Sequence, residues 1–418
     1  MYFKTYYMKQ TVLWAAIALM MAACSSDNGS KAEPVICPTT IDLTRGEQQL
    51  VNSNNDFAFN LMRQVTTGEQ YMQSKILSPI SITYALGMLN NGAAGETRQQ
   101  INQVLGFQTA SEANNFCRKM LTAAPGLDPQ TKVLISNTIF LNKPYMLKPA
   151  FVQTANDYYD AQPETRDFHD GQTADIINQW ASDHTERMIE KVIGADELNP
   201  DAVSYLLNAI YFKGTWENKF KEEDTRQESF NGGQPVAMMH QQHTFRYADK
   251  GDYQALELPY GNGAYAMTIL LPNEGKTIGD VLTQLTAESW ENLWMTGILR
   301  ERATVDVKLP RFETKTEQNL AKTMALLGMP NTFDEVLADF PDFCEKPTFI
   351  GMMKQAARIK VNEEGTEAAA VTIIGDSNTA LPSPELVYFH ATRPFLYVIS
   401  ERFTGAIFFM GQYYGESR

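Results

Sequence analysis

The chain has 418 residues, of which 44% are hydrophobic and 20% charged, a composition typical of folded proteins and not of disordered or repetitive ones. Its 49 acidic residues outnumber its 35 basic residues, so the net charge at pH 7 is -14. A polyanion such as DNA or RNA is therefore repelled on average, which disfavours nucleic-acid binding.

The first 48 residues predict export and a tether. Residues 1–23 combine two lysines with an apolar run that is too short to span a bilayer. Met21-Ala22-Ala23-Cys24 resembles a bacterial lipobox, in which Cys24 receives the lipid, although Met21 stands where Leu is usual. An ordinary signal peptide cleaved nearby is the alternative. We expect residues 24–48 to form a polar tether and residues 49–418 to form one domain.

This reading implies an exported lipoprotein at the outer membrane, the cell surface or in the periplasm, attached to the membrane through its lipid only. If Cys24 carries lipid, Cys37, Cys117 and Cys344 remain, an odd number at irregular spacing. Neither a disulfide framework nor a metal cluster is predicted from them.

Helical spacing of apolar residues predicts three helices early in the domain. They cover residues 57–65 after Asn55, 82–89 before Gly92, and 101–105 between Thr97 and Gly106. Runs of β-branched or aromatic residues then predict strands at 132–141, 203–212, 264–271 and 304–309. Gly261-Asn262-Gly263 predicts a hairpin turn, and two further apolar runs, 395–399 and 406–410, end the chain. This mixture favours an α+β protein with large antiparallel or mixed sheets.

The motifs of common enzymes are incomplete. Gly375-Asp376-Ser377 is half of a nucleophile elbow, with Thr379 where the second Gly belongs. His240 and His243 are three residues apart but have no HExxH motif with them. We therefore predict that the protein is not an enzyme and needs no metal or cofactor.

The most informative segment begins near Val361. In a strand that starts at Gly365, Thr366, Ala368, Ala370, Thr372 and Ile374 would face one side. That face carries no charge and no Pro interrupts the segment, so it could enter a sheet without burying an ion. Gly365 provides a swivel, and three consecutive alanines are weak strand formers. The segment is thus suited to storage as an exposed loop; an Ala-rich helical turn in a surface connection is the alternative.

This segment resembles the hinge of the serpins, a family of serine protease inhibitors, and the resemblance extends over nearly the whole mature chain. The motifs that carry it are NAIYFKGTWENKF at 208–220, SPISI at 78–82, GAAGET at 92–97, LPRF at 309–312, ADF at 338–340 and RPFL at 393–396. The resemblance implies a serpin fold: a single domain with three β-sheets, about eight to nine helices and an exposed reactive-centre loop at about 363–388.

The resemblance also implies roles for individual residues. The hinge comprises Glu363, Glu364, Gly365, Thr366, Glu367, Ala368, Ala369 and Ala370. The shutter and breach, where the central sheet opens, include Ser78, Ser81, Asn208, Trp216 and Gln355. Gln355 occupies a position where many family members have His, which puts pH-sensitive opening in doubt. Ordinary buried polar residues, and for Trp216 a packed core position, are the alternatives.

The implied activity is suicide inhibition. A protease attacks the loop and forms an acyl-enzyme, and the cut loop inserts into the central sheet with the protease attached. By the family's spacing from Glu363, the cut falls between Thr379 and Ala380, although Asn378 or Ala380 could be acylated instead. Residues 375–384 contain no Lys or Arg, so elastase-like or subtilisin-like proteases are expected partners, with papain-like cysteine proteases second. A non-inhibitory carrier is the main alternative, and a monomer is expected.

Overall fold

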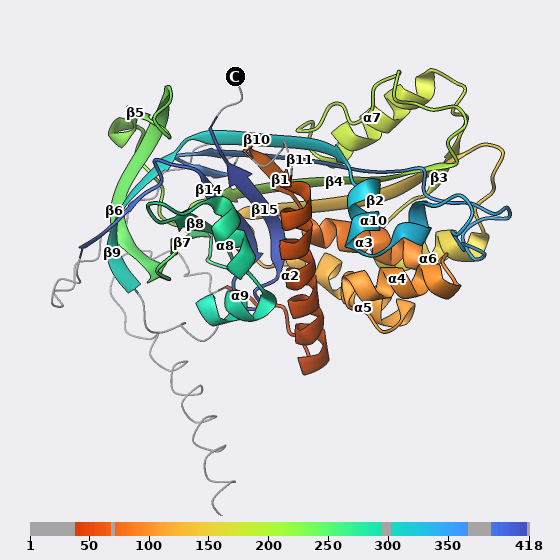
Figure 1. Ribbon diagram of the computed structural model, residues 1–418, viewed down its shortest axis with the longest axis horizontal. Coiled ribbons are helices and arrows are strands. Elements are labelled where there is room, and N and C mark those ends of the chain that lie inside the picture. Colours follow the sequence, from red (N-terminus) through yellow and green to blue (C-terminus); the bar gives the residue numbers. More distant parts are fainter. Residues whose placement is uncertain (1–37, 68–71, 295–301, 367–385, 416–418) are drawn as a thin grey trace, which may run out of the picture. The chain divides into compact units, whose positions relative to one another are not determined.

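The computed structural model describes residues 38–67, 72–294, 302–366 and 386–415. The chain divides into two compact units, Met1–Cys37 and Pro38–Arg418. The first unit lies outside the described residues. The second contains the helices and sheets described below, and Figure 1 labels them in chain order.

The first described helix, α2, spans Arg45–Val65 and begins well before the predicted start after Asn55. A capping box fixes its N-terminus: the Thr44 hydroxyl accepts the Glu47 N–H, and the Glu47 carboxylate accepts the Thr44 N–H. Residues 45–48, which we assigned to the tether, therefore belong to this helix. Ile41, which precedes it, is already buried, so the folded part begins before residue 49.

Eight further α-helices follow in the described residues, which agrees with the eight to nine expected. They are α3 Pro79–Asn90, α4 Gly95–Leu105, α5 Ala110–Ala123, α6 Pro149–Tyr159, α7 Gln172–His184, α8 Ile278–Gln284, α9 Ala287–Trp294 and α10 Ala321–Leu327, with short 3-10 turns at Ala124–Gly126, Glu222–Asp224 and Pro330–Phe333. Every residue of α3 is buried. The α4 helix ends at Gly106, as predicted, with a left-handed φ of 77°.

A six-stranded sheet forms the centre of the molecule. Its strands, in spatial order, are β10 Phe312–Asn319, β11 Met352–Asn362, β12 Gly365–Thr366, β4 Ser204–Thr215, β2 Thr131–Asn142 and β3 Glu164–Arg166. The predicted strands at 132–141 and 203–212 are its long strands β2 and β4, which pair antiparallel. The β4 strand is almost continuously buried, which is typical of a strand covered on both faces.

The remaining strands form a nine-stranded sheet. It runs β1 Lys75–Leu77, β15 Ile407–Tyr413, β14 Phe395–Glu401, β8 Tyr265–Pro272, β7 Tyr253–Tyr260, β6 Pro235–Asp249, β9 Arg302–Pro310 and β13 Leu386–His390, and β5 Arg226–Ser229 pairs with β6. Two sheets were expected here in addition to the central one. Hydrogen bonding joins them because the long β6 pairs with β9 over most of its length and with β7 at its end.

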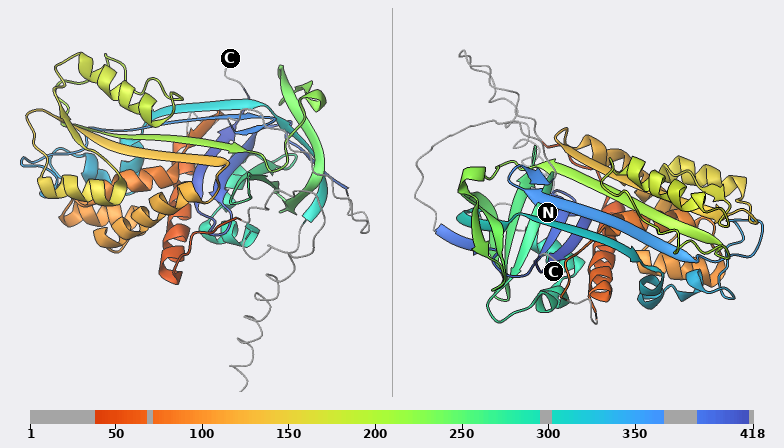
Figure 2. Two further views of the ribbon diagram at one scale, coloured as in Figure 1. Left: turned by 180° about the vertical axis from the view of Figure 1, so that it is seen from behind. Right: turned by 90° about the horizontal axis from the view of Figure 1, so that it is seen from above.

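The six-stranded sheet lies between helices on both faces (Figures 1 and 2). On one face, α7 packs against β2 and β4 through a small apolar cluster that includes Ile177, Phe140 and Tyr205. On the other face, the main core lies between α3 and the neighbouring helices, and it continues beneath the nine-stranded sheet. The α+β fold is therefore confirmed, and any strand added to the central sheet has to fit between these two layers.

Candidate functional site

The boundary between β11 and β4, which we call the seam, changes along its length. Residues 352–357 of β11 pair directly with residues 205–210 of β4 in parallel. Beyond them, the two-residue strand β12 lies between β11 and β4 and pairs antiparallel with both. The chain thus turns back after Asn362 and places Gly365 and Thr366 in the sheet. The seam is closed at one end and contains the first residues of the predicted hinge at the other.

Gly365 is required by this turn. Its φ is +147°, and a Cβ at this position would lie 2.1 Å from the carbonyl oxygen of Gly214. The Asn362 side chain closes the turn, because its Oδ1 accepts the N–H of Glu364 at 3.0 Å and that of Gly365 at 3.2 Å. The predicted swivel is therefore the only residue type that fits here without moving β4.

Two glutamates anchor the chain just before β12. The buried Glu363 carboxylate accepts hydrogen bonds from the Arg311 guanidinium at 2.6 and 3.1 Å and from the Thr225 hydroxyl at 2.6 Å. Burial by itself raises the pKa of Glu363, but these hydrogen bonds outweigh it and the pKa lies below its ordinary value. Glu364 pairs with Lys219 at 2.6 Å.

An aromatic pair flanks the same point. The Trp216 indole N–H donates to the Asn362 carbonyl at 2.9 Å, and its backbone N–H donates to the Glu364 carbonyl at 2.9 Å. Its ring stacks on Tyr260 with centroids 4.4 Å apart. The Tyr260 hydroxyl lies 2.7 Å from the Thr366 hydroxyl, and burial raises the pKa of Tyr260, so this hydroxyl stays protonated. Trp216 therefore lies beside β12, where residues 365 and 366 join the sheet.

Four predicted shutter residues meet at the closed end of the seam. Gln355 on β11 and Asn208 on β4 lie opposite each other, and the Gln355 Nε2 donates to the Asn208 Oδ1 at 2.6 Å. The Gln355 Nε2 also lies 3.0 Å from the Ser78 carbonyl oxygen. The Ser81 hydroxyl donates to the Asn208 Oδ1. All four residues are buried, and Ser78 and Ser81 belong to the start of α3, so the polar cluster ties the seam to that helix.

Sequence reasoning missed a fifth member of this cluster. Asn137 on β2 lies opposite Asn208 and accepts a hydrogen bond from the Asn208 Nδ2 at 2.6 Å. Its own Nδ2 is buried with no partner among the described residues. Three amides therefore form a row across β11, β4 and β2. The available signal was the polar triplet Ser136-Asn137-Thr138 between the apolar runs 133–135 and 139–141. Arg311, Tyr260 and Thr225 were also missed as hinge partners, because their contacts span distant segments.

The rest of the predicted site lies outside the described residues. This concerns the hinge residues Glu367, Ala368, Ala369 and Ala370, the reactive bond between Thr379 and Ala380, and the lipid-attachment residue Cys24. The described part of the loop region comprises only its two ends, which are residues 363–366 on one side and β13 on the other.

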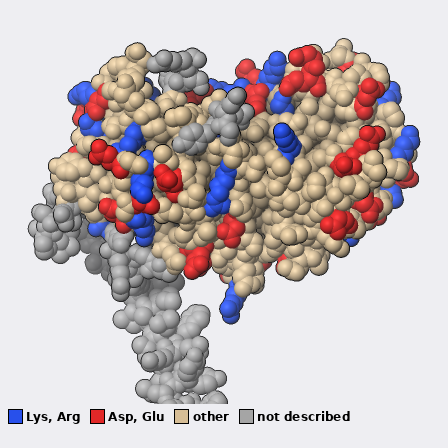
Figure 3. Space-filling view, in the orientation of Figure 1, with Lys and Arg blue, Asp and Glu red and all other residues tan. Residues whose placement is uncertain are grey.

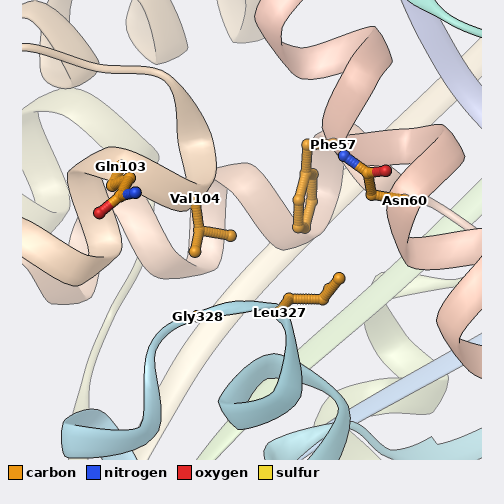
Figure 4. Close-up of a pocket in the computed structure, with 6 residues that line it drawn as sticks. All are labelled: Phe57, Asn60, Gln103, Val104, Leu327 and Gly328. Atoms are coloured by element: carbon orange, nitrogen blue, oxygen red, sulfur yellow. The ribbon is translucent and has the colours of Figure 1, made fainter.

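Other features of the described residues do not form a second site of comparable organisation. A cavity of about 210 Å³ lies between α2, α4 and the end of α10, lined by Phe57, Asn60, Gln103, Val104, Leu327 and Gly328 (Figure 4). No group of three or more metal-ligating side chains occurs in the described ranges. Among the helices that the structure describes, none has the length and apolarity needed to span a membrane. Acidic and basic side chains are interspersed on the face shown in Figure 3.

Comparisons with known proteins agree on one family. The family model described as "Serpin (serine protease inhibitor)" matches residues 52–415. The chain is 31% identical to Serpin B8 of Bos taurus, over 87% of this chain and 98% of that protein. It is 30% identical to an uncharacterized serpin-like protein of Thermococcus kodakarensis, over 97% of this chain and 98% of that protein.

Solved structures show the same similarity. The native state of the thermophilic serpin tengpin superposes with a TM-score of 0.81 at 24% identity, covering 92% of this chain and 99% of that chain. Thyroxine-binding globulin in complex with thyroxine superposes with a TM-score of 0.78 at 25% identity, covering 88% of this chain and 100% of that chain.

Proposed function

Because this chain belongs to the serpin family, whose members are generally protease inhibitors and not enzymes, we propose that it is a suicide-substrate inhibitor of extracellular serine proteases. The target attacks the reactive-centre loop with its own nucleophile and forms an acyl-enzyme. The cut loop then enters the six-stranded sheet between β11 and β4 and carries the attached protease with it. The inhibitor supplies no catalytic residue.

The observation that carries this proposal is the register of β12. Residues 365 and 366 pair antiparallel with residues 362 and 361 of β11 and with residues 215 and 214 of β4. If this register continues, position 372 falls opposite both Gln355 and Asn208. Those two residues already face each other across the closed seam. One incoming strand therefore fits between β11 and β4 without any shift of their mutual register.

Thr372 has the chemistry that this central position requires. Insertion breaks the hydrogen bond between Gln355 and Asn208, and both amides are buried, so leaving them unpaired would be costly. The Thr372 hydroxyl can accept from the Gln355 amide and donate to the Asn208 carbonyl oxygen. Both amides thus keep a partner after the seam opens.

On the opposite face of the incoming strand, the pairing of opposite charges favours insertion. In the same register, position 367 falls between Lys360 of β11 and Lys213 of β4. Glu367 would then lie between two cations on the side of the sheet that faces α7. Residues 366, 368, 370, 372 and 374, on the core side, carry no charge. Both faces of the segment are therefore compatible with its place in the sheet.

Insertion also provides the energy for trapping the protease. About ten new ladder hydrogen bonds at a net ~1 kcal/mol each stabilise the cut form by on the order of 10 kcal/mol. This is comparable to the whole stability of an ordinary domain, ~5–15 kcal/mol. The uncut form is accordingly metastable, and its lifetime is governed by the barrier to opening the seam.

The composition of the loop supports targets that accept small uncharged residues. Residues 375–384 contain neither Lys nor Arg, and Thr379 and Ala380 flank the proposed cut. Proteases with shallow primary pockets, such as elastase-like or subtilisin-like enzymes, can accept these residues, and papain-like cysteine proteases are a second class. This stretch offers a trypsin-like enzyme no Lys or Arg to pair with the acidic residue of its primary pocket.

The proposal is tested by mixing the purified protein with an elastase and running a denaturing gel. A covalent band at the summed mass is expected. Clean cleavage with full protease activity would contradict the proposal. Thr379→Arg is expected to transfer complex formation to trypsin, whereas Ser377→Arg, a matched control in the same stretch, should yield cleavage without a complex. If Ala380→Arg forms the complex with trypsin instead, the reactive bond lies one residue further along the chain.

A non-inhibitory carrier is the second candidate, because thyroxine-binding globulin is among the similar structures. The cavity in Figure 4 has a volume of about 210 Å³, and a second, more open one beside Glu47 and Glu112 has about 450 Å³. The second volume lies within the roughly 300–1,000 Å³ of usual ligand pockets, so cavity size does not separate the two candidates. The uncharged core-side face of the hinge favours inhibition. Saturable binding of an iodinated aromatic ligand without any protease complex would favour the carrier.

We also propose that the protein is an exported lipoprotein attached through Cys24, at the outer membrane, the cell surface or in the periplasm. The lipobox-like Met21-Ala22-Ala23-Cys24 supports this proposal. Metabolic labelling with a fatty acid should mark the wild-type protein and not Cys24→Ala. Equal recovery of both proteins in the soluble fraction would contradict it.

A further inference from the structure

One face of β13, the strand that follows the reactive-centre loop, carries two exposed apolar side chains. Phe389 is fully buried, whereas Leu386 is 40% exposed and Tyr388 is 60% exposed. Residues two apart in a strand point to the same face, so Leu386 and Tyr388 are neighbours on the outer face of the sheet. Single exposed apolar side chains are ordinary on protein surfaces. A pair fixed on a strand next to the loop is a candidate contact surface.

The strands beside β13 continue this outer face with polar side chains. In the strand register, the residues level with the pair on β9 and then on β6 are Thr304, Asp306, Thr244 and Gln242. Both oxygens of the Asp306 carboxylate already have partners, the His390 Nε2 of β13 at 2.8 Å and the His240 Nε2 of β6 at 3.1 Å. At these positions an approaching surface therefore meets apolar, hydroxyl and amide groups and one carboxylate that is already paired.

Tyr388 is held in position by its surroundings. All five residues of β13 pair with β9, and the Phe389 side chain fills the core beneath them. The Tyr388 ring meets the His390 ring edge to face, with centroids 5.6 Å apart and an interplanar angle of 80°. A tyrosine held in this way loses little conformational freedom on binding, and such residues often dominate the affinity of an interface.

The length of the loop brings the target protease to this face. Leu386 follows Ala380, the residue just after the proposed cut, by six residues, and six residues span at most about 20 Å even when fully extended. A protease domain of ~200 residues has a radius of gyration of ~16 Å, which corresponds to an outer radius of roughly 20 Å. The surface around its active site therefore extends as far as β13 when the reactive bond is bound.

We propose that Leu386 and Tyr388, with Thr244 and Gln242 beside them, form a docking surface for the target protease, separate from the reactive bond. The identity of the occupant rests on the proposed function. Its matching surface is apolar and offers a hydrogen-bond acceptor to the Tyr388 hydroxyl. Small uncharged residues such as Thr379 give a protease pocket little to distinguish. Contacts at the docking surface therefore select among proteases that share this preference, and they do so before any bond is cut.

The test measures binding of the full chain to an elastase and to a subtilisin in which the nucleophilic serine is replaced by alanine. Such a protease binds the loop but cannot form an acyl-enzyme, so the readout is the affinity of the non-covalent complex. We expect Tyr388→Ala to weaken binding to at least one of them about ten-fold, and Leu386→Ala to weaken it several-fold. Tyr388→Phe, which keeps the ring, should retain most of the affinity.

Leu326→Ala is the matched control, because Leu326 is a 62% exposed leucine on α10. It should bind both inactive proteases as wild type does, and the Tm of each variant verifies that it is folded. Contact is tested directly with the photoreactive residue benzoylphenylalanine in place of Tyr388. It should cross-link to the inactive protease, whereas the same residue in place of Leu326 should not. A merely structural role of Tyr388 would give no such cross-link.

Unchanged affinity in both Tyr388→Ala and Leu386→Ala, or no binding of wild type to either inactive protease, would overturn the docking surface. Self-association of wild type that is lost in Tyr388→Ala would assign this face to a second copy of the chain and overturn it as well. The proposed function fails separately. Docking of the inactive protease without a covalent complex with the active one would remove inhibition and leave the docking surface, whereas a covalent complex with unchanged docking in the variants would do the reverse.

Discussion

The two sheets of this protein differ in how their buried interiors are built. In the nine-stranded sheet, every residue of β8, β14 and β15 is buried, and most of them are aliphatic or aromatic. In the six-stranded sheet, the amides of Gln355, Asn208 and Asn137 lie across the centre. Apolar packing between strands cannot be exchanged for anything else without exposing it to water. Hydrogen bonds across a polar seam can be exchanged for those of a new strand, so under the proposed function the nine-stranded sheet serves as a frame and the six-stranded sheet is the one that opens.

The largest expected effect comes from Ala370→Arg. If the register of β12 continues, position 370 falls on the core side between residue 357 of β11 and residue 210 of β4, both buried, so a charge there would have to be buried on insertion. We expect the variant to be cleaved as a substrate and to lose the stabilisation of the cut form by insertion, on the order of 10 kcal/mol. The rise in Tm expected after cleavage of the wild type should then disappear. Ala370→Val, which adds no charge, should keep most of it.

A substitution in the frame should behave differently. Ile399 of β14 is fully buried, and Ile399→Ala is expected to destabilise the protein by about 2–5 kcal/mol through the cavity it creates. The loss should be equal in the uncut and cut forms, because the frame does not rearrange. Thermal unfolding of both forms measures this. A variant that changes the difference in Tm between them would show that the nine-stranded sheet also takes part in the transition.

Glu363→Gln tests the anchor at the end of the seam that contains β12. Loss of the charged partner of Arg311 should destabilise the uncut form by about 1.5–3 kcal/mol at pH 7. The pKa of Glu363 is lowered in the fold, so its contribution is present above the ordinary carboxyl range and is lost as pH falls through the lowered value. Urea unfolding at neutral and acidic pH should show the difference from wild type shrinking in acid. Glu364→Gln, which affects a more exposed ion pair with Lys219, should cost less than about 1 kcal/mol.

Thr372→Val tests the register of insertion. It removes the hydroxyl expected between Gln355 and Asn208, so the cut form alone should lose about 1 kcal/mol. The uncut form should be unaffected, and Thr372→Ser should behave like wild type. A smaller effect than that of Thr379→Val, at a threonine seven residues further along the chain, would mean that another residue occupies the centre of the seam.

Gln355→His is expected to have the smallest effect. Amides do not titrate, so the closed seam of wild type contains no group that changes charge near neutral pH. An imidazole buried among Ser78, Ser81 and Asn208 is destabilised when it becomes charged. Opening of the seam, measured as the rate of protease trapping relative to wild type, should therefore increase a few-fold between pH 8 and pH 5.5. A flat ratio would show that the shutter does not limit opening.

Local patterns in the sequence account for much of the fold. Helical spacing identifies α3 and α4, and runs of β-branched residues identify β2, β4, β8 and β9. These predictions succeed because periodicity is a property of consecutive residues. The start of α2 at Arg45 was missed because its first turns are polar and only the capping box of Thr44 and Glu47 marks it. The joining of two expected sheets was missed because it depends on where the long β6 finds partners.

By itself, the sequence determined the family motifs, the glycine at residue 365, the uncharged core-side face that follows it and the absence of Lys and Arg from residues 375–384. These are properties of single residues and of their order in the chain. Only the tertiary structure decided that Arg311 holds Glu363, that Asn137 extends the row of amides and that Asp306 links β6, β9 and β13. Each of these contacts joins segments far apart in the chain, and their distances are set by the packing of the whole domain and not by any local pattern.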